Sequence, residues 1–140
     1  MKTILDEIVA QKRVEILEKQ KIQSIEDFKN SENFNLPIKS SKESILDESK
    51  SGIIAEFKRK SPSKGFINKD ANVKEVVSGY EKYGASVVSV LTDEQFFGGS
   101  FDDLQQAKEV LNIPVLRKDF IVDEFQVYET KAIGADLMLL

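Results

Sequence analysis

A short apolar run with two charges near its end, Ile53-Ile54-Ala55-Glu56-Phe57-Lys58, opens a pattern that repeats to the last residue. Further apolar runs follow at residues 87–91, at 115–116 with its continuation, and at 137–140. The segments between them have apolar residues every three or four positions, which is typical of helices, at 73–80, 101–111 and 125–133. Alternating strands and helices predict a parallel sheet covered by helices.

Two α/β architectures fit this alternation: an open, doubly wound sheet and a closed (β/α)8 barrel. Periodicity alone does not separate them. No Gly-x-Gly-x-x-Gly motif and no lysine-bearing phosphate loop follows any of the apolar runs, which weakens the nucleotide-binding sheet. A barrel needs about 250 residues, whereas this chain has 140 and four predicted strands. Both architectures stay open from the residues alone; if the fold is a barrel, about half of it is present and the chain ends inside the fourth strand.

The first part of the chain has a different character. Thr3 and Asp6 have the spacing of a capping box at the start of a predicted helix over residues 4–21. Ser24 and Asp27 repeat this spacing before a short second helix, and a serine-rich connector that we expect to pack loosely follows at 30–52. The sequence thus predicts an N-terminal helical extension over residues 1–52 and a half-barrel over 53–140.

Composition narrows the class of function. Hydrophobic residues make up 41% and charged residues 31%, which is typical of a globular protein. The net charge of −4 argues against a general binder of nucleic acid or of anionic membranes. Without a long apolar run or a signal-like start we expect a cytoplasmic protein with no membrane span. The absence of Cys and His leaves proton transfer to Lys, Glu, Asp or Tyr.

Charged residues occupy the ends of two predicted strands. Glu56 and Lys58 lie two residues apart and hence on one face, either as a structural ion pair or as part of a ligand site. Lys118 ends the third strand, so both lysines point to the mouth where α/β folds bind ligands. This placement favours a functional role for Lys118. Arg117 and Asp119 share the opposite face, where pairing with the outer helices is favoured.

Two loops add weaker signals. The basic segment 58–65 suits an anionic substrate, or else is only a solvated loop. Nucleic acid is disfavoured as its partner, because aromatic residues are absent from it and the whole chain is acidic. The segment 91–100 contains Phe96 and Phe97, which either line an aromatic pocket or pack on the connector. From the residues alone, packing is the favoured reading.

The segments 54–63, 91–100 and 116–121 together resemble three successive motifs of the indole-3-glycerol phosphate synthase family. The extension is similar too, so that the resemblance spans all 140 residues. It implies a TIM barrel and a carbon–carbon lyase (carboxy-lyase) of tryptophan biosynthesis. The family closes the ring of 1-(2-carboxyphenylamino)-1-deoxyribulose 5-phosphate, with loss of carbon dioxide and water, to give indole-3-glycerol phosphate.

The resemblance also implies roles for particular residues. Lys118 would be the general acid that protonates the ribulose carbonyl as the aromatic carbon attacks it. Lys58 would bind the anions of the substrate and hold its reactive conformation. Glu56 would orient the two lysines and balance their charge. No cofactor and no metal is implied.

Substrate binding would involve three further residues. Ser61 would help to position the phosphorylated substrate, and Phe97 and Phe120 would enclose its anthranilate ring. The family's remaining acid, base and phosphate-binding residues are expected beyond residue 140. We therefore expect an N-terminal part of a synthase that is inactive alone and that self-associates through exposed apolar edges.

Two alternatives stay open. One is another phosphate-binding barrel such as phosphoribosylanthranilate isomerase, or a fusion of both activities. That enzyme should show a Cys and Asp pair, and Cys is absent. The other is a non-catalytic half-barrel that dimerises and binds anions.

Overall fold

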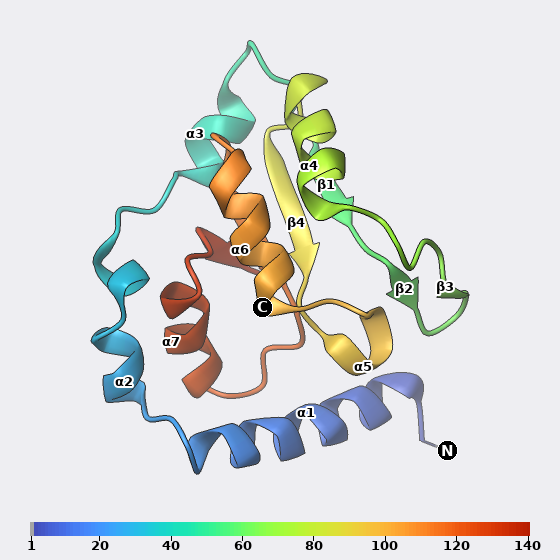
Figure 1. The fold of residues 1–140 in the computed structure, drawn as a ribbon, viewed down its shortest axis with the longest axis vertical. Helices are drawn as coiled ribbons and strands as arrows, with labels where there is room; N and C mark the ends of the chain where they lie inside the picture. The colour runs from blue at the N-terminus through green and yellow to red at the C-terminus, as the bar shows by residue number, and fades with distance from the viewer. Residues whose placement is uncertain (1) are drawn as a thin grey trace.

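The computed structural model describes residues 2–140 and has an α/β architecture (Figure 1). Its helices are α1 (Ile4–Gln20), α2 (Ile25–Lys29), the 3-10 helix η1 (Glu32–Asn35), α3 (Ser41–Leu46), α4 (Val73–Lys82), α5 (Glu94–Phe97), α6 (Phe101–Val110) and α7 (Phe125–Ala132). Its strands are β1 (Ile54–Phe57), β2 (Lys60–Ser61), β3 (Gly65–Phe66), β4 (Val87–Leu91), β5 (Val115–Lys118) and β6 (Leu137–Met138). Within residues 2–140, no helix combines the length and apolar composition that crossing a bilayer requires.

Strands β1, β4, β5 and β6 form one parallel sheet in that order. Each new strand is added beside the preceding one, whereas a doubly wound sheet reverses its strand order. The order without reversal is that of a (β/α)8 barrel, and the predicted half-barrel is confirmed. The fourth strand is shorter than predicted, because β6 ends at Met138.

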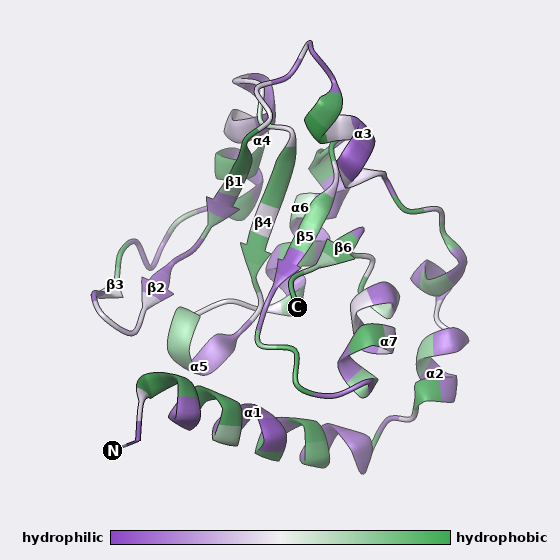
Figure 2. Cartoon of the chain, turned by 180° about the vertical axis from the view of Figure 1, so that it is seen from behind, coloured by the Kyte–Doolittle hydropathy of each residue, from purple (hydrophilic) through white to green (hydrophobic). Residues whose placement is uncertain are grey.

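The core lies on the face of this sheet that the helices cover. Val88, Val90 and Val115 have no exposed surface. They belong to one cluster with Val77 of α4 and Leu104 of α6, which are equally buried. Figure 2 shows β4 as hydrophobic along most of its length, whereas the arrowheads of β1 and β5 are hydrophilic. Polar side chains therefore gather at the carboxyl ends of the strands.

Helices α1 and α2 begin with the two predicted capping boxes. The Thr3 hydroxyl accepts a hydrogen bond from the Asp6 N–H at 3.2 Å, and the Asp6 carboxylate accepts from the Thr3 N–H at 2.7 Å. Ser24 and Asp27 make the same pair of bonds. Helix α1 ends at Gln20, one residue before the predicted end. It runs across the end of the molecule toward which the strand arrows point (Figure 1).

The connector at 30–52 is mostly exposed, with Ser44 its one buried residue, as expected of a loosely packed segment, yet it makes defined contacts that were not predicted. It contains η1 and α3. The Ser44 hydroxyl donates to the carbonyl of Ser86 at 2.6 Å, and the Lys39 N–H donates to Asp136 at 2.8 Å. Its serines thus bind defined backbone groups of the half-barrel, which composition alone does not reveal.

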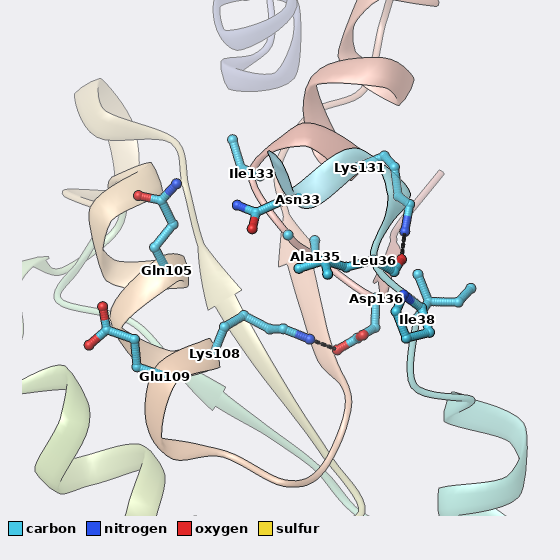
Figure 3. Close-up of a pocket in the computed structure, with 12 residues that line it drawn as sticks. Asn33, Leu36, Ile38, Gln105, Lys108, Glu109, Lys131, Ile133, Ala135 and Asp136 are labelled. Atoms are coloured by element: carbon cyan, nitrogen blue, oxygen red, sulfur yellow. Dashed lines mark hydrogen bonds and ion pairs between the residues drawn. The ribbon is translucent and has the colours of Figure 1, made fainter. Parts of the chain in front are cut away.

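A cavity of about 410 Å³ lies between the connector and helices α6 and α7 (Figure 3). On its wall, Lys108 Nζ is 2.6 Å from Asp136 Oδ2, and Lys131 Nζ donates to the carbonyl of Leu36. Asp136 Oδ2 also accepts from the N–H of Val115 at 2.8 Å, at the start of β5. Asp136 therefore joins the connector, α6 and the sheet.

The basic loop after β1 forms an antiparallel hairpin that the sequence did not predict. Lys60 pairs with Phe66 and Ser61 with Gly65. Gly65 has φ 65°, a left-handed conformation that suits glycine. Lys60 Nζ donates to the carbonyl of Gln95 at 2.7 Å, which ties the hairpin to α5.

Gly99 follows α5 in a position with no room for a side chain. A Cβ added there would lie 2.0 Å from the carbonyl oxygen of Leu91, at the end of β4. We expect Gly99→Ala to lower the free energy of unfolding by about 1–3 kcal/mol, as other overpacked sites do. Urea denaturation measures this change.

Gly79, within α4, is the matched control. An added Cβ meets no heavy atom within 4 Å there. Gly79→Ala should raise the free energy of unfolding by about 0.5–1 kcal/mol, since alanine favours helix interiors. Equal midpoints for Gly99→Ala and the parent chain would contradict the steric argument.

Candidate active site

Glu56 lies between two lysines at the carboxyl ends of β1 and β5. Its Oε1 is 3.0 Å from Nζ of Lys58, and its Oε2 is 3.1 Å from Nζ of Lys118. The parallel register produces this meeting, because β4 pairs with β1 on one side and with β5 on the other. The structure thus brings together the three charged residues that the sequence directs to one mouth of the sheet.

The two lysines keep the Glu56 carboxyl ionised. Partial burial raises its pKa, but hydrogen bonds and charge from Lys58 and Lys118 have the larger combined effect, so the pKa lies below its ordinary value of 4.5. About a third of each of the three side chains is exposed (31–39%). Two ammonium groups and one carboxylate leave one net positive charge, which favours an anionic ligand.

An aromatic pair stands beside these charges. The ring centroids of Phe97 and Phe120 are 6.0 Å apart, with an angle of 36° between the ring planes. Both rings border a cavity of about 640 Å³ that also contains the three charged residues. One further charged residue, Asp119, borders the cavity and is paired with Arg117 and Lys12. The rest of the lining is apolar: Leu5, Val9, Leu91, Ile121, Val122, Leu139 and Leu140. The site therefore offers an apolar wall for a ring next to a cationic cluster.

Ser61 lies apart from this cavity. It belongs to β2 of the hairpin and is buried. Its hydroxyl is 3.4 Å from that of Ser63 and accepts from the Lys64 N–H at 3.3 Å. Of the six site residues predicted from sequence, Ser61 is the one that the structure does not bring to the cavity.

A buried hydroxyl lies next to Glu56 on the same face of the sheet. Ser89 of β4 pairs in register with Glu56 on one side and with Leu116 on the other. It is 3% exposed, and its Oγ has no hydrogen-bond partner within residues 2–140. Sequence analysis did not single out Ser89, although it is the one polar residue in the otherwise apolar run 87–91.

Arg117 lies on the opposite face of the sheet, as predicted, and Asp119 follows the end of β5. The guanidinium Nη2 of Arg117 is 3.0 Å from Asp119 Oδ2 and 2.9 Å from Glu129 Oε2 of α7. Its Nη1 donates to the hydroxyl of Thr130 at 2.9 Å. Arg117 is 1% exposed and pairs with α7, so the prediction of pairing on the helical side is confirmed for Arg117. Asp119 differs, because it also pairs with Lys12 of α1 and borders the cavity.

Lys12 of α1 is the charged residue that sequence reasoning missed. It is 5% exposed, and its Nζ lies 2.9 Å from Asp93 and 3.1 Å from Asp119. Burial lowers its pKa, but the negative charges around it outweigh burial and raise the pKa above its ordinary value. A signal was present, because Lys12 is four residues from both Ile8 and Ile16, which are buried on the same helix face.

Asp119 makes the stability of the fold depend on pH. Burial raises its pKa, but the charges of Arg117 and Lys12 and a hydrogen bond from Thr92 bring it below the ordinary 3.8. A carboxyl whose pKa is lower in the folded chain than in the unfolded chain stabilises the fold at pH values above its unfolded pKa. That stability is lost as the pH falls through its folded pKa.

We therefore expect Asp119→Asn to destabilise the chain most at neutral pH and progressively less below pH 3.8. Urea denaturation of both proteins over this range measures the difference. A difference that stays constant down to the acid limit would contradict the linkage.

Comparison with known proteins adds independent evidence. The family model for indole-3-glycerol phosphate synthase matches residues 5–140. A protein of that name from Bacteroides thetaiotaomicron is 51% identical over 141 residues, which cover 100% of this chain and 54% of the relative. One from Clostridium acetobutylicum is 45% identical, and the match covers 98% of this chain and 52% of the relative. One from Prochlorococcus marinus is 46% identical, and the match covers 99% of this chain and 48% of the relative.

The chain spans about half the length of the curated relatives it matches. The match nevertheless includes all four strands of the parallel sheet and the cluster at its mouth. It also includes nearly all of α1, whose side chains help to line the cavity. On this evidence the chain belongs to the indole-3-glycerol phosphate synthase family.

Proposed function

We propose that this chain supplies the general acid and part of the substrate site of an indole-3-glycerol phosphate synthase. The reaction closes the ring of 1-(2-carboxyphenylamino)-1-deoxyribulose 5-phosphate and releases carbon dioxide and water, in tryptophan biosynthesis in the cytoplasm. The observation that carries the proposal is the bridge from Glu56 to Lys58 and Lys118 beside an aromatic wall. The names of the relatives support it.

The charged cluster suits a ring closure that needs an acid and an anion site. Lys118 donates a proton to the carbonyl oxygen of the ribulose while the aromatic carbon attacks the carbonyl carbon. Lys58 binds the anionic groups of the substrate and holds it in the reactive conformation. Glu56 accepts hydrogen bonds from both lysines and so keeps their ammonium groups on one side of the cavity.

The remaining residues bind and shape the substrate. Phe97 and Phe120 help to enclose the anthranilate ring as one aromatic wall beside the charged cluster, because the two rings form a contacting pair. Ser61 lies apart from the cavity and contributes indirectly, because its hydroxyl accepts from the Lys64 N–H and so shapes the hairpin that follows Lys58. We divide the chain into an extension over residues 1–52 and a barrel part over 53–140. The proposed reaction uses a small phosphorylated substrate and needs no metal, cofactor, nucleic acid or membrane.

A chimera tests this function. Residues 1–140 are followed by the portion of the Bacteroides relative that the chain does not match, and product formation is measured with purified protein. We expect turnover by the chimera and none by the 140-residue chain alone. An inactive, folded chimera would overturn the proposal and favour a non-catalytic anion-binding role, whereas turnover by the chain alone would refute its dependence on further residues.

We also expect the 140-residue chain to self-associate. Ile53, Ile54 and Leu140 are large apolar residues with exposed fractions of 58%, 47% and 92%. They lie beside or at the ends of β1 and β6, whose outer edges have no strand partner within residues 2–140. Light scattering should show species larger than a monomer, and a monodisperse monomer over a wide concentration range would contradict this.

A further inference from the structure

Lys12 links α1 to two loops of the barrel part at once. Its Nζ is within 3.1 Å of Asp93, which follows β4, and of Asp119, which follows β5. Asp93 is 1% exposed and Asp119 is 9% exposed. A buried ammonium group between two buried carboxylates holds both of them in place. If one of the three groups lost its partners, its unpaired buried charge would strongly lower the free energy of unfolding.

Each of these carboxylates continues the link to an aromatic residue of the cavity. Asp93 Oδ1 accepts from the N–H of Phe96 at 2.8 Å and caps α5, whose last residue is Phe97. Asp119 Oδ1 accepts from the N–H of Phe120 at 2.8 Å. Two short chains of hydrogen bonds therefore run from one lysine to the backbone on either side of the aromatic pair.

We propose that Lys12 is a positioning residue that sets the separation of Phe97 and Phe120. It acts through Asp93 and through Asp119, which borders the cavity, whereas Lys12 itself is not one of the lining residues. The inference deepens the proposed function and rests on it for the identity of the bound ring. It assigns to one residue of the extension control over how tightly the barrel part holds an aromatic substrate.

Lys19 is the matched control for Lys12. It lies on the same helix and also makes an ion pair, at 2.6 Å, with Glu129 of α7. It contacts neither Asp93 nor Asp119. Removing either lysine weakens the attachment of α1, but only Lys12 of the two contacts Asp93 and Asp119 directly. Lys19 reaches Asp119 only through Glu129 and Arg117, and it has no such path to Asp93.

The kinetic test uses the active chimera. We expect Lys12→Met to raise KM about tenfold and to lower kcat less, whereas Lys19→Met leaves KM within about twofold. In a chimera that already carries Phe97→Ala and Phe120→Ala, Lys12→Met should have no further effect on KM, because residues acting through one another are non-additive. Equal effects of the two lysine changes, or full additivity, would overturn the proposal.

A second measurement is independent of enzyme activity. Amide hydrogen exchange in the 140-residue chain should be faster at 92–100 and 118–123 in Lys12→Met, and unchanged there in Lys19→Met. Unchanged exchange in Lys12→Met refutes the positioning role even if the chimera is active. An inactive parent chimera refutes the proposed function while the exchange result still decides the role of Lys12.

A double substitution tests the proposal if Lys12→Met alone fails to fold. Lys12→Met with Asp93→Asn removes one positive and one negative charge, and asparagine can still cap α5. This double variant should show the same faster exchange in both loops. Exchange like that of the parent chain would count against the proposal.

Discussion

Lys118→Met in the chimera is expected to lower kcat by about 10²–10⁴-fold, the usual contribution of a general acid. Methionine has nearly the length of lysine but carries no proton to donate. Lys118 is 39% exposed and makes one ion pair, with Glu56. Its loss should therefore change the free energy of unfolding by only about 0–1 kcal/mol. Product formation and urea denaturation of the same preparation measure the two effects.

Lys74→Met provides the control for losing an exposed, paired lysine. Lys74 of α4 pairs with Glu109 of α6 at 2.6 Å and is 44% exposed, but it lies outside the cavity. Its replacement should leave kcat unchanged. If Lys118→Met instead keeps its turnover and loses stability, the ion pair with Glu56 is structural and the proposed acid is wrong.

Arg117→Met should cause the largest loss of stability. The guanidinium is 1% exposed and pairs with Asp119 and Glu129, so its removal leaves two buried carboxylates with one lysine partner each, Lys12 and Lys19. Breaking a buried ion pair in this way lowers the free energy of unfolding by about 3–5 kcal/mol. Urea denaturation of the 140-residue chain measures the change.

Arg13→Met serves as the reference substitution. Arg13 follows Lys12 on α1 and is exposed, so its replacement should change the free energy of unfolding by no more than about 0.5 kcal/mol. Similar losses for the two arginines would show that the buried pairs contribute little. That outcome would also weaken the view that this network fixes the loops after β4 and β5.

Long elements could be predicted because their signals are local. The apolar run of β4 and the spacing of Val73 and Val77 in α4 each identify an element without reference to the rest of the chain. The hairpin β2–β3 and helix α3 are too short to show a period. They depend instead on distant partners, such as the carbonyls of Gln95 and Ser86 that accept from Lys60 and Ser44.

The site residues divide in the same way, into those with local signals in the sequence and those that depend on distant partners. Glu56, Lys58 and Lys118 could be predicted to meet, because strand parity and the common direction of parallel strands suffice to place them. The distance of Ser61 from the cavity follows from a hairpin that has no clear sequence signal. Lys12 was missed because a lysine on a helix is ordinarily solvated, and its two buried partners, Asp93 and Asp119, lie far away in the sequence.

The attachment of α1 has a consequence for synthesis of the chain. Lys19 and its partner Glu129 are separated by 110 residues, and Gln20 and its partner Asp123 by 103. At about 5–20 residues per second, the ribosome needs roughly 5–20 s to make that interval. During this time the apolar face of the first helix has no docking surface and is open to chaperones. Helix α1 therefore reaches its native place only after the residues that it contacts have been made, 103–110 positions later.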